Sequence, residues 1–185
     1  MVDWDVRYRD GNYDGTGKPH ALLARFGSLI PKGPVIDIAS GTGRDALFLA
    51  GEGHPVWGLE RSAEALKIAS EQNTSRGHGA AFVKADASAL PFKRRSAAGV
   101  TVFYFLLRDI MGEIVDLLAK DGILIYETFL KRQNMIDRLR NPDYLLDDGE
   151  LISCFRALDL IFYEEKIISS NGKRRAIAQF VGRKP

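Results

Sequence analysis

Three carboxylates lie at the ends of three predicted strands in the first half of the chain. Asp37 belongs to the apolar run 35–38, Glu60 follows the run 55–59, and Asp86 follows the run 81–84. Ligands of open α/β sheets bind at the carboxyl ends of the strands. Acids at that edge can accept hydrogen bonds from the two hydroxyls of a ribose and from the amino group of a base. The spacing therefore predicts a site for a nucleoside cofactor.

A glycine-rich turn joins the first predicted strand to the next helix. Gly41 and Gly43 begin the run 41–46, which satisfies the dinucleotide pattern G-x-G-x-x-G/A with an alanine at its end. Glycine has no Cβ, so the backbone can turn sharply and a nucleoside can lie against it. The first N–H groups of the following helix then point at the ligand. The pattern alone does not say which nucleoside cofactor is bound.

Apolar runs alternate with helical patterns along the chain, which is typical of βαβ units around a parallel sheet. The turn 170–173 contains Asn-Gly, a strong signal for an antiparallel hairpin. We therefore predict an α/β fold with a single Rossmann-like doubly wound sheet, mostly parallel and closed by a C-terminal antiparallel hairpin. The expected helices are 19–29, 43–50, 62–77, 110–119 and 148–157, and the expected strands are 35–38, 55–59, 81–84, 99–106, 123–128, 160–168 and 176–181.

The length of 185 residues predicts one domain, residues 1–185. Residues 1–30 are expected to form an arm and a helix over the cofactor site, and 130–147 a long loop. The formal net charge is only +2, and the longest apolar stretch, 97–107, is too short to span a bilayer. With no signal-peptide core near the N-terminus, a cytoplasmic protein without a membrane partner is the simplest interpretation.

The sequence resembles the class I S-adenosylmethionine-dependent methyltransferases over nearly its whole length. Their first motif is an acid followed by small-x-Gly-x-Gly, seen here in the run 37–43, with Ala39 where a glycine is common. Glu60 matches the ribose-binding acid of that family, and Asp86 matches its adenine-side acid. Ala87 would then offer its backbone N–H to the ring. The resemblance implies the class I methyltransferase fold and S-adenosyl-L-methionine as cofactor.

Within that superfamily the chain is similar to the small methyltransferases of the tellurite-resistance and thiol-methyltransferase type. This likeness implies methyl transfer to a small-molecule acceptor, a thiol or a chalcogen oxyanion, by in-line displacement. No dedicated acid–base pair is evident in the sequence, which favours a soft or pre-ionised acceptor. The similar segments are 4–8, 40–50, 57–62, 126–129, 141–146 and 149–151.

The candidate site residues fall into two groups. Tyr8, Tyr104 and Arg108 are the expected catalytic residues on the acceptor side, with Tyr13, His20 and Glu127 as further acceptor-side candidates. Trp4, Tyr8 and Tyr13 either form a flap over the cofactor or anchor an N-terminal arm. The expected cofactor-binding residues are Asp37, Ala39, Ser40, Gly41, Gly43, Arg44, Glu60, Arg61, Asp86, Ala87 and Phe103.

Arg44 and Phe103 have more specific roles in this scheme. Arg44 either pairs with the methionine carboxylate or an anionic acceptor, or is a solvated helix residue. Phe103 would offer its backbone carbonyl to the cofactor's ammonium group.

Other functions stay open. A nicotinamide oxidoreductase of the short-chain type needs a Tyr-x-x-x-Lys pair, and no tyrosine here has a lysine four residues on. An RNA methyltransferase would use basic runs such as 93–95 and 173–175 to contact phosphates, and these runs otherwise are solvated loops. A protein methyltransferase also stays open. A non-catalytic cofactor binder would carry the same residues. Cys154 is expected in the core rather than as a nucleophile, and the scattered histidines predict no metal site.

Overall fold

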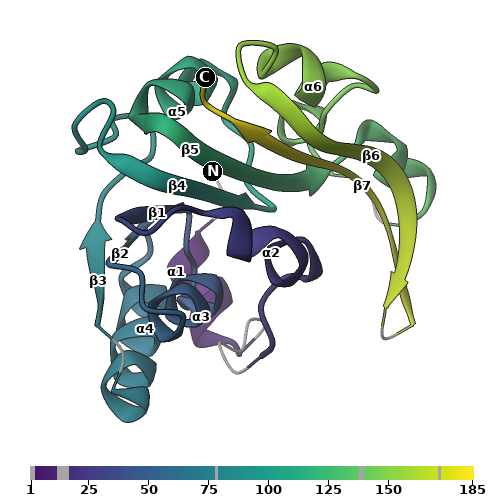
Figure 1. The fold of residues 1–185 in the computed structure, drawn as a ribbon. Helices are drawn as coiled ribbons and strands as arrows, with labels where there is room; N and C mark the ends of the chain where they lie inside the picture. Colours follow the sequence, from purple (N-terminus) through teal and green to yellow (C-terminus); the bar gives the residue numbers. More distant parts are fainter. Residues whose placement is uncertain (1–2, 12–16, 78, 138–139, 171) are drawn as a thin grey trace.

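The computed structural model describes residues 3–11, 17–77, 79–137, 140–170 and 172–185. Its centre is one seven-stranded sheet with the strand order β3-β2-β1-β4-β5-β7-β6 (Figure 1). The strands are β1 (Val35–Ile38), β2 (Val56–Glu60), β3 (Ala80–Lys84), β4 (Ala97–Phe103), β5 (Leu118–Phe129), β6 (Asp159–Ser170) and β7 (Lys173–Arg183).

The sheet is parallel except at one end. Strands β3, β2, β1, β4 and β5 pair in parallel, and β7 pairs antiparallel with both β5 and β6. This confirms the predicted fold class, including the closing hairpin. The strand order reverses between β1 and β4, and such a switch point is where ligands of open α/β sheets bind. The glycine-rich turn after β1 lies at this point.

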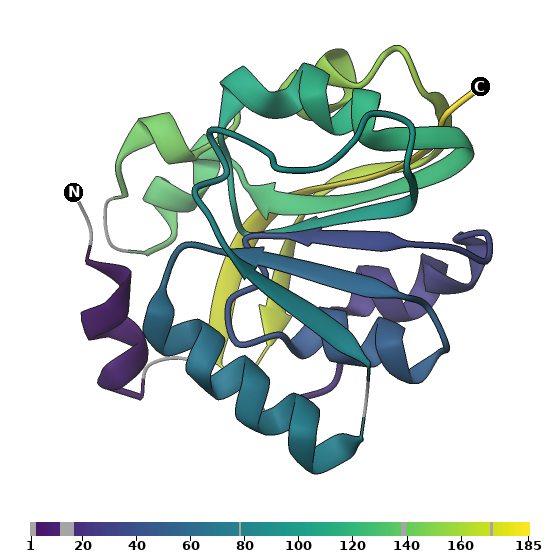
Figure 2. The ribbon, with the colours of Figure 1, turned by 90° about the vertical axis from the view of Figure 1, so that its left-hand side faces the viewer.

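Helices cover both faces of the sheet (Figures 1 and 2). One face packs against α5 and α6 through residues such as Ile114 and Leu151, and the other against α2 and α3 through Leu23 and Leu47. The helices are α1 (Trp4–Arg9), α2 (Ala21–Phe26), α3 (Arg44–Gly51), α4 (Ala63–Arg76), α5 (Met111–Leu117) and α6 (Glu150–Cys154).

The central strand β4 is buried along its whole length, as a strand covered on both faces should be. Burying one large aliphatic side chain of this kind stabilises a fold by about 1.5–3 kcal/mol. The carboxyl edge of the sheet is therefore anchored by a strand that is buried throughout.

Several element boundaries differ from the sequence-based prediction. Strand β4 was predicted to reach residue 106, but it ends at Phe103 because Tyr104 has φ +53°, which turns the chain out of the sheet. Helix α5 ends at Leu117, so β5 begins earlier than predicted. The prediction that Cys154 lies in the core was wrong, because Cys154 is exposed at the end of α6. Helix α1 was not predicted at all. It begins where the side chain of Asp3 accepts a hydrogen bond from the N–H of Val6.

The segment predicted as a long loop, 130–147, is closed at its base. The N–H of Lys131 donates to the carbonyl of Leu146, and the N–H of Leu146 donates to the carbonyl of Phe129. Short 3₁₀ turns occupy Lys131–Met135 and Pro142–Tyr144. Among the described residues, no helix combines the length and the apolar character needed to cross a bilayer.

Candidate functional site

Glu60 is fixed beside the glycine-rich turn by two backbone donors. Its Oε2 accepts from the N–H of Gly41 at 3.0 Å, and its Oε1 accepts from the N–H of Ser62 at 2.8 Å. The side chain is only 6% exposed. Each carboxylate oxygen keeps a further lone pair, so Glu60 can accept hydrogen bonds from two vicinal hydroxyls without rearranging.

The turn itself presents bare backbone. Gly41 and Gly43 have φ +55° and +81°, and a Cβ on Gly41 would lie 2.8 Å from the hydroxyl of Tyr8. The buried Oγ of Ser40 has no hydrogen-bond partner among the described residues. A nucleoside cofactor such as S-adenosylmethionine fits these features: the exposed backbone of the glycine-rich turn, the unpaired Ser40 hydroxyl and the Glu60 carboxylate. Ala39 has φ +56°, a conformation that suits glycine and explains why glycine is common there in the resembled family.

Asp37 lies beneath this turn in the interior. It is 3% exposed and accepts a hydrogen bond from the Thr101 hydroxyl at 2.7 Å. Burial and the nearby Asp45 carboxylate raise the pKa of Asp37 to about 8. Its predicted contact with the cofactor stays a prediction.

Asp86 is placed differently, at the surface beyond β3. Its side chain is 59% exposed and accepts from the N–H of Ser88 at 2.9 Å. Hydrogen bonds from Ser88 lower the pKa of Asp86, so the group is a carboxylate at neutral pH. Arg61 lies 4.0 Å away, and Ala87 is buried. Asp86 is therefore accessible to an amino group of a ligand.

His20 and Asp45 form a pair that the sequence analysis missed. Asp45 accepts from the backbone N–H of His20 at 2.9 Å and contacts its Nδ1 at 2.6 Å. The guanidinium of Arg44 contacts Nε2 of the same ring. A guanidinium only donates and a carboxylate only accepts, so the His20 ring lies between one donor group and one acceptor group. The two residues are 25 positions apart, and no sequence pattern announces the pair.

Tyr104 and Glu127 meet at the ends of β4 and β5. The N–H of Tyr104 donates to the carbonyl of Glu127 at 2.8 Å, which holds Tyr104 in its left-handed conformation. Burial and the Glu127 carboxylate raise the pKa of Tyr104. Its ring lies 4.7 Å from Phe129 and 5.2 Å from His20. The predicted acceptor-side residues Tyr104, His20 and Glu127 are thus brought together, with Phe103 stacked on His20 at 4.3 Å.

Tyr8 lies at the cofactor turn because α1 is fastened to the start of α4. Asp5 accepts from the Ser62 hydroxyl at 2.5 Å and from the N–H of Glu64 at 3.3 Å. These contacts set the Tyr8 hydroxyl against Gly41. Trp4 lies beside Tyr8, with ring centroids 6.2 Å apart. The third residue of the expected flap, Tyr13, lies outside the described residues.

The Arg108 side chain is bound to other parts of the protein. Its Nε donates to Glu150 at 2.6 Å, and its other nitrogens donate to the carbonyls of Asp143 and Leu145 at 2.7 and 2.9 Å. The hydrogen bond from Arg108 and the backbone N–H of Asp147 keep the pKa of Glu150 low against its burial. These contacts pin the segment 142–146 to α6, and the predicted catalytic role of Arg108 stays a prediction.

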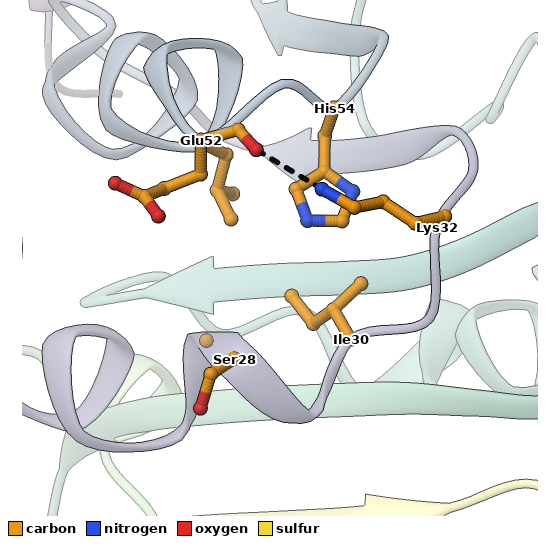
Figure 3. A pocket seen from close by; sticks show the side chains of 7 residues that line it. Ser28, Ile30, Lys32, Glu52 and His54 are labelled. Atoms are coloured by element: carbon orange, nitrogen blue, oxygen red, sulfur yellow. Dashed lines mark hydrogen bonds between the residues drawn. The ribbon is translucent and has the colours of Figure 1, made fainter.

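A cavity of about 210 Å³ lies at the opposite edge of the sheet (Figure 3). Ile30 and Lys32 precede β1 and His54 precedes β2, so this cavity is at the amino ends of the strands. Lys32 donates to the carbonyl of Glu52 across it. It shares no lining residue with the glycine-rich turn. In the described ranges, no group of three or more His, Cys, Asp or Glu side chains is arranged to hold a metal ion.

Comparison with known proteins agrees with this geometry. Residues 35–122, somewhat less than half of the chain, match a family described as methyltransferase domain. This stretch runs from β1 into β5 and includes the glycine-rich turn, Glu60 and Asp86. No curated protein matches the sequence.

Solved structures match over almost the whole chain. One, from work on the conversion of a disulfide bond into a thioacetal group during echinomycin biosynthesis, has a TM-score of 0.76 at 21% identity, covering 98% of this chain and 90% of that one. TehB from Haemophilus influenzae has a TM-score of 0.77 at 14% identity, and the match covers 98% of this chain but only 66% of TehB.

A SAM-dependent methyltransferase from Aquifex aeolicus matches over 100% of both chains, with a TM-score of 0.71 and 12% identity. The chain therefore has the fold of the class I S-adenosylmethionine-dependent methyltransferases. The family match and the fold together support S-adenosyl-L-methionine as its cofactor.

Proposed function

We propose that the protein is an S-adenosylmethionine-dependent methyltransferase that acts on a small-molecule acceptor, a thiol or a chalcogen oxyanion. The observation that carries the proposal is Glu60, held by the N–H groups of Gly41 and Ser62 beside a turn of bare backbone. A nicotinamide dinucleotide would use the same turn, but the chain lacks the Tyr-x-x-x-Lys pair that short-chain dehydrogenases use to move a proton. The family match favours methyl transfer.

Each candidate residue at the carboxyl edge of the sheet has its own proposed contact with the cofactor. Glu60 would accept from the ribose hydroxyls, and Asp86 would accept from the adenine amino group while Ala87 offers its N–H. Arg44 would pair with the methionine carboxylate. When bound, S-adenosylmethionine supplies a methyl group on a sulfonium, which a nucleophilic atom of the acceptor takes by in-line displacement, leaving S-adenosylhomocysteine. The chain then needs chiefly to align the acceptor and to exclude water.

His20 provides the proton acceptor that a thiol requires. A thiol has a pKa near 8.5, so most of it carries its proton at neutral pH. The His20 ring would take that proton once Arg44 turns toward a carboxylate, and the Asp45 carboxylate beside Nδ1 would stabilise the imidazolium that forms. A chalcogen oxyanion needs no such base. The echinomycin-related neighbour, which concerns sulfur chemistry, supports testing thiols first.

Calorimetric titration with S-adenosylhomocysteine, with NADH and NADPH alongside, tests the cofactor. We expect micromolar binding of S-adenosylhomocysteine alone, and binding of a nicotinamide cofactor instead would refute the proposal. Transfer of labelled methyl to thiols, selenite, tellurite and RNA then tests the acceptor. Transfer to RNA but to no small molecule would contradict the proposed acceptor class while leaving the methyltransferase assignment intact.

A further inference from the structure

The first helix, α1, is too short to hold its own position in the fold. It has six residues, and none of them is buried. An isolated helix of this length is unstable in water, because nucleation is costly and few hydrogen bonds follow it. The place of α1 beside the start of α4 (Figure 2) therefore depends on contacts that its side chains make with the rest of the chain.

Asp5 joins α1 to the first turn of α4. Its Oδ1 accepts from the Ser62 hydroxyl at 2.5 Å and from the N–H of Glu64 at 3.3 Å. The Ser62 hydroxyl in turn accepts from the N–H of Ala65 at 3.2 Å, which caps α4. The hydrogen bond from Ser62, followed by that from Glu64, lowers the pKa of Asp5, so this group is a carboxylate at neutral pH.

Ser62 connects this contact to the candidate ribose acid. Its N–H donates to Oε1 of Glu60 at 2.8 Å, and the residue is only 2% exposed. A hydroxyl buried to this degree needs an acceptor, and leaving its donor unpaired is unfavourable. Without the Asp5 carboxylate, Ser62 would have to move toward another acceptor. Such a movement would disturb the N–H group that holds one oxygen of Glu60.

Tyr8 connects α1 to the second donor that fixes Glu60. Asp5 and Tyr8 are three residues apart in the helix, so they lie on one face of it. The Tyr8 hydroxyl lies against Gly41, 2.8 Å from the position of an added Cβ. The N–H of Gly41 donates to Oε2 of Glu60 at 3.0 Å. One face of α1 thus contacts both residues whose N–H groups orient Glu60.

We propose that Asp5 is a positioning residue for cofactor binding, which sets the orientation of Glu60 toward the ribose hydroxyls by docking α1. It acts through Ser62 on one oxygen of Glu60 and through Tyr8 and Gly41 on the other. Asp5 itself is not proposed to touch the cofactor. This inference rests on the proposed function, since it requires that Glu60 binds the ribose.

The test compares adenosine with 2′,3′-dideoxyadenosine in calorimetric or NMR titrations of the full chain. The ratio of the two affinities reports the hydrogen bonds that the ribose hydroxyls make with Glu60. Asp5→Ala should weaken adenosine binding by about fivefold to tenfold, the loss expected for one hydrogen bond, and should lower the ratio by a similar factor. A purely structural role would weaken both ligands alike. Equal losses for the two ligands, or no loss, would overturn the proposal.

The substitution itself does not weaken α1, because alanine is a better helix former than aspartate. Both hydrogen bonds of Asp5 go to the same oxygen, Oδ1. Asp5→Asn keeps an oxygen in this position, so it should restore part of the preference for adenosine that Asp5→Ala loses.

Arg9 provides the matched control, because it also joins α1 to α4. Its guanidinium donates to Glu64 at 3.1 Å, but its side chain is 63% exposed. Such surface pairs contribute little, so Arg9→Gln should leave the affinity ratio within about twofold of the wild type. Equal losses in Arg9→Gln and Asp5→Ala would show a general loosening of α1 and refute a specific role for Asp5.

Glu60→Gln separates failure of this inference from failure of the proposed function. Affinity for S-adenosylhomocysteine and thermal unfolding are measured in every variant, which shows that each is folded. If Glu60→Gln loses the preference for adenosine while Asp5→Ala keeps it, the present inference is overturned and the proposed function stands. If the wild type binds no S-adenosylhomocysteine, or Glu60→Gln keeps the preference, the ribose assignment is refuted and the role of Asp5 with it.

Discussion

Replacement of Glu60 by glutamine tests the centre of the proposed site with almost no change in shape. In the wild type the two carboxylate oxygens accept from two backbone donors, the N–H groups of Gly41 and Ser62. A glutamine amide has only one oxygen, so in Glu60→Gln one backbone N–H must face an NH₂ group instead of an acceptor. The variant therefore loses a charge-assisted hydrogen bond and leaves a poorly satisfied donor inside the protein.

The expected effect on stability follows from that single lost bond. Leaving a buried donor without its acceptor costs about 1–3 kcal/mol. For a domain of this size each kcal/mol lowers the melting temperature by about 2–4 °C, so Glu60→Gln should melt about 2–12 °C lower. Thermal unfolding followed by circular dichroism measures this directly. A melting temperature equal to that of the wild type would refute the two-donor description of Glu60.

The same substitution should weaken ligand binding, since ribose hydroxyls would lose a charged acceptor. A loss of about 1–3 kcal/mol corresponds to roughly a fivefold to hundredfold lower affinity for S-adenosylhomocysteine. Glu64→Gln is the control, because Glu64 pairs with the exposed Arg9 and such a surface pair contributes little. If Glu60→Gln and Glu64→Gln bound S-adenosylhomocysteine equally well, the ribose assignment would be wrong.

Three further substitutions, and Gly112→Ala as a control, probe other positions. Gly43→Ala should destabilise the fold by about 1–3 kcal/mol, because φ is +81° and a Cβ would lie 2.8 Å from the Phe82 ring. Gly112 lies in helix α5 with open space around it, so Gly112→Ala should stabilise the fold by about 0.5–1 kcal/mol. Chemical denaturation measures both changes. Asp37 keeps its proton to about pH 8 when folded but loses it near pH 4 when unfolded, so wild-type stability falls between these values as the pH rises, by at most about 1.4 kcal/mol per pH unit. Asp37→Asn should remove this slope in denaturation curves recorded from pH 4 to 8, and an unchanged slope would show that Asp37 is ionised in the fold. Asp86→Ala should weaken adenosine and S-adenosylhomocysteine alike in calorimetry, and a loss confined to the latter would contradict an adenine contact.

The sequence predicted the strands and the turn that carry the candidate cofactor residues because their signals are local. The strand, turn and helix that present Gly41 and Gly43 are contiguous, and the strand that ends in Glu60 follows within one βα unit. Parallel strands bring their carboxyl ends to one edge, so an acid at each end is enough to predict a shared site. The hairpin at the end of the sheet was also predictable, since Asn-Gly between two apolar runs is a local signal.

The acceptor half depends on contacts between residues far apart in the sequence. His20 meets Asp45 because α2 packs beside the first turn of α3, and Arg175 meets Tyr104 because β7 runs past the end of β5. Neither packing leaves a periodic pattern in the sequence. The early end of β4 was equally hidden, because the apolar run continues to residue 107 and only the backbone conformation of Tyr104 reveals the turn.

Backbone strain marks the two places where the site departs from regular structure. Ala39 and Tyr104 both adopt left-handed conformations, at φ +56° and +53°, one just after β1 and the other just after β4. Each such residue costs about 1–2 kcal/mol relative to ordinary backbone. These strands are neighbours at the switch point of the sheet, and β4 is buried throughout, so the core offsets that cost. The left-handed residues turn the chain out of the sheet at the ends of both strands. Since neither residue is a glycine, both positions also retain side chains, and that of Tyr104 is the link between Glu127 and Arg175.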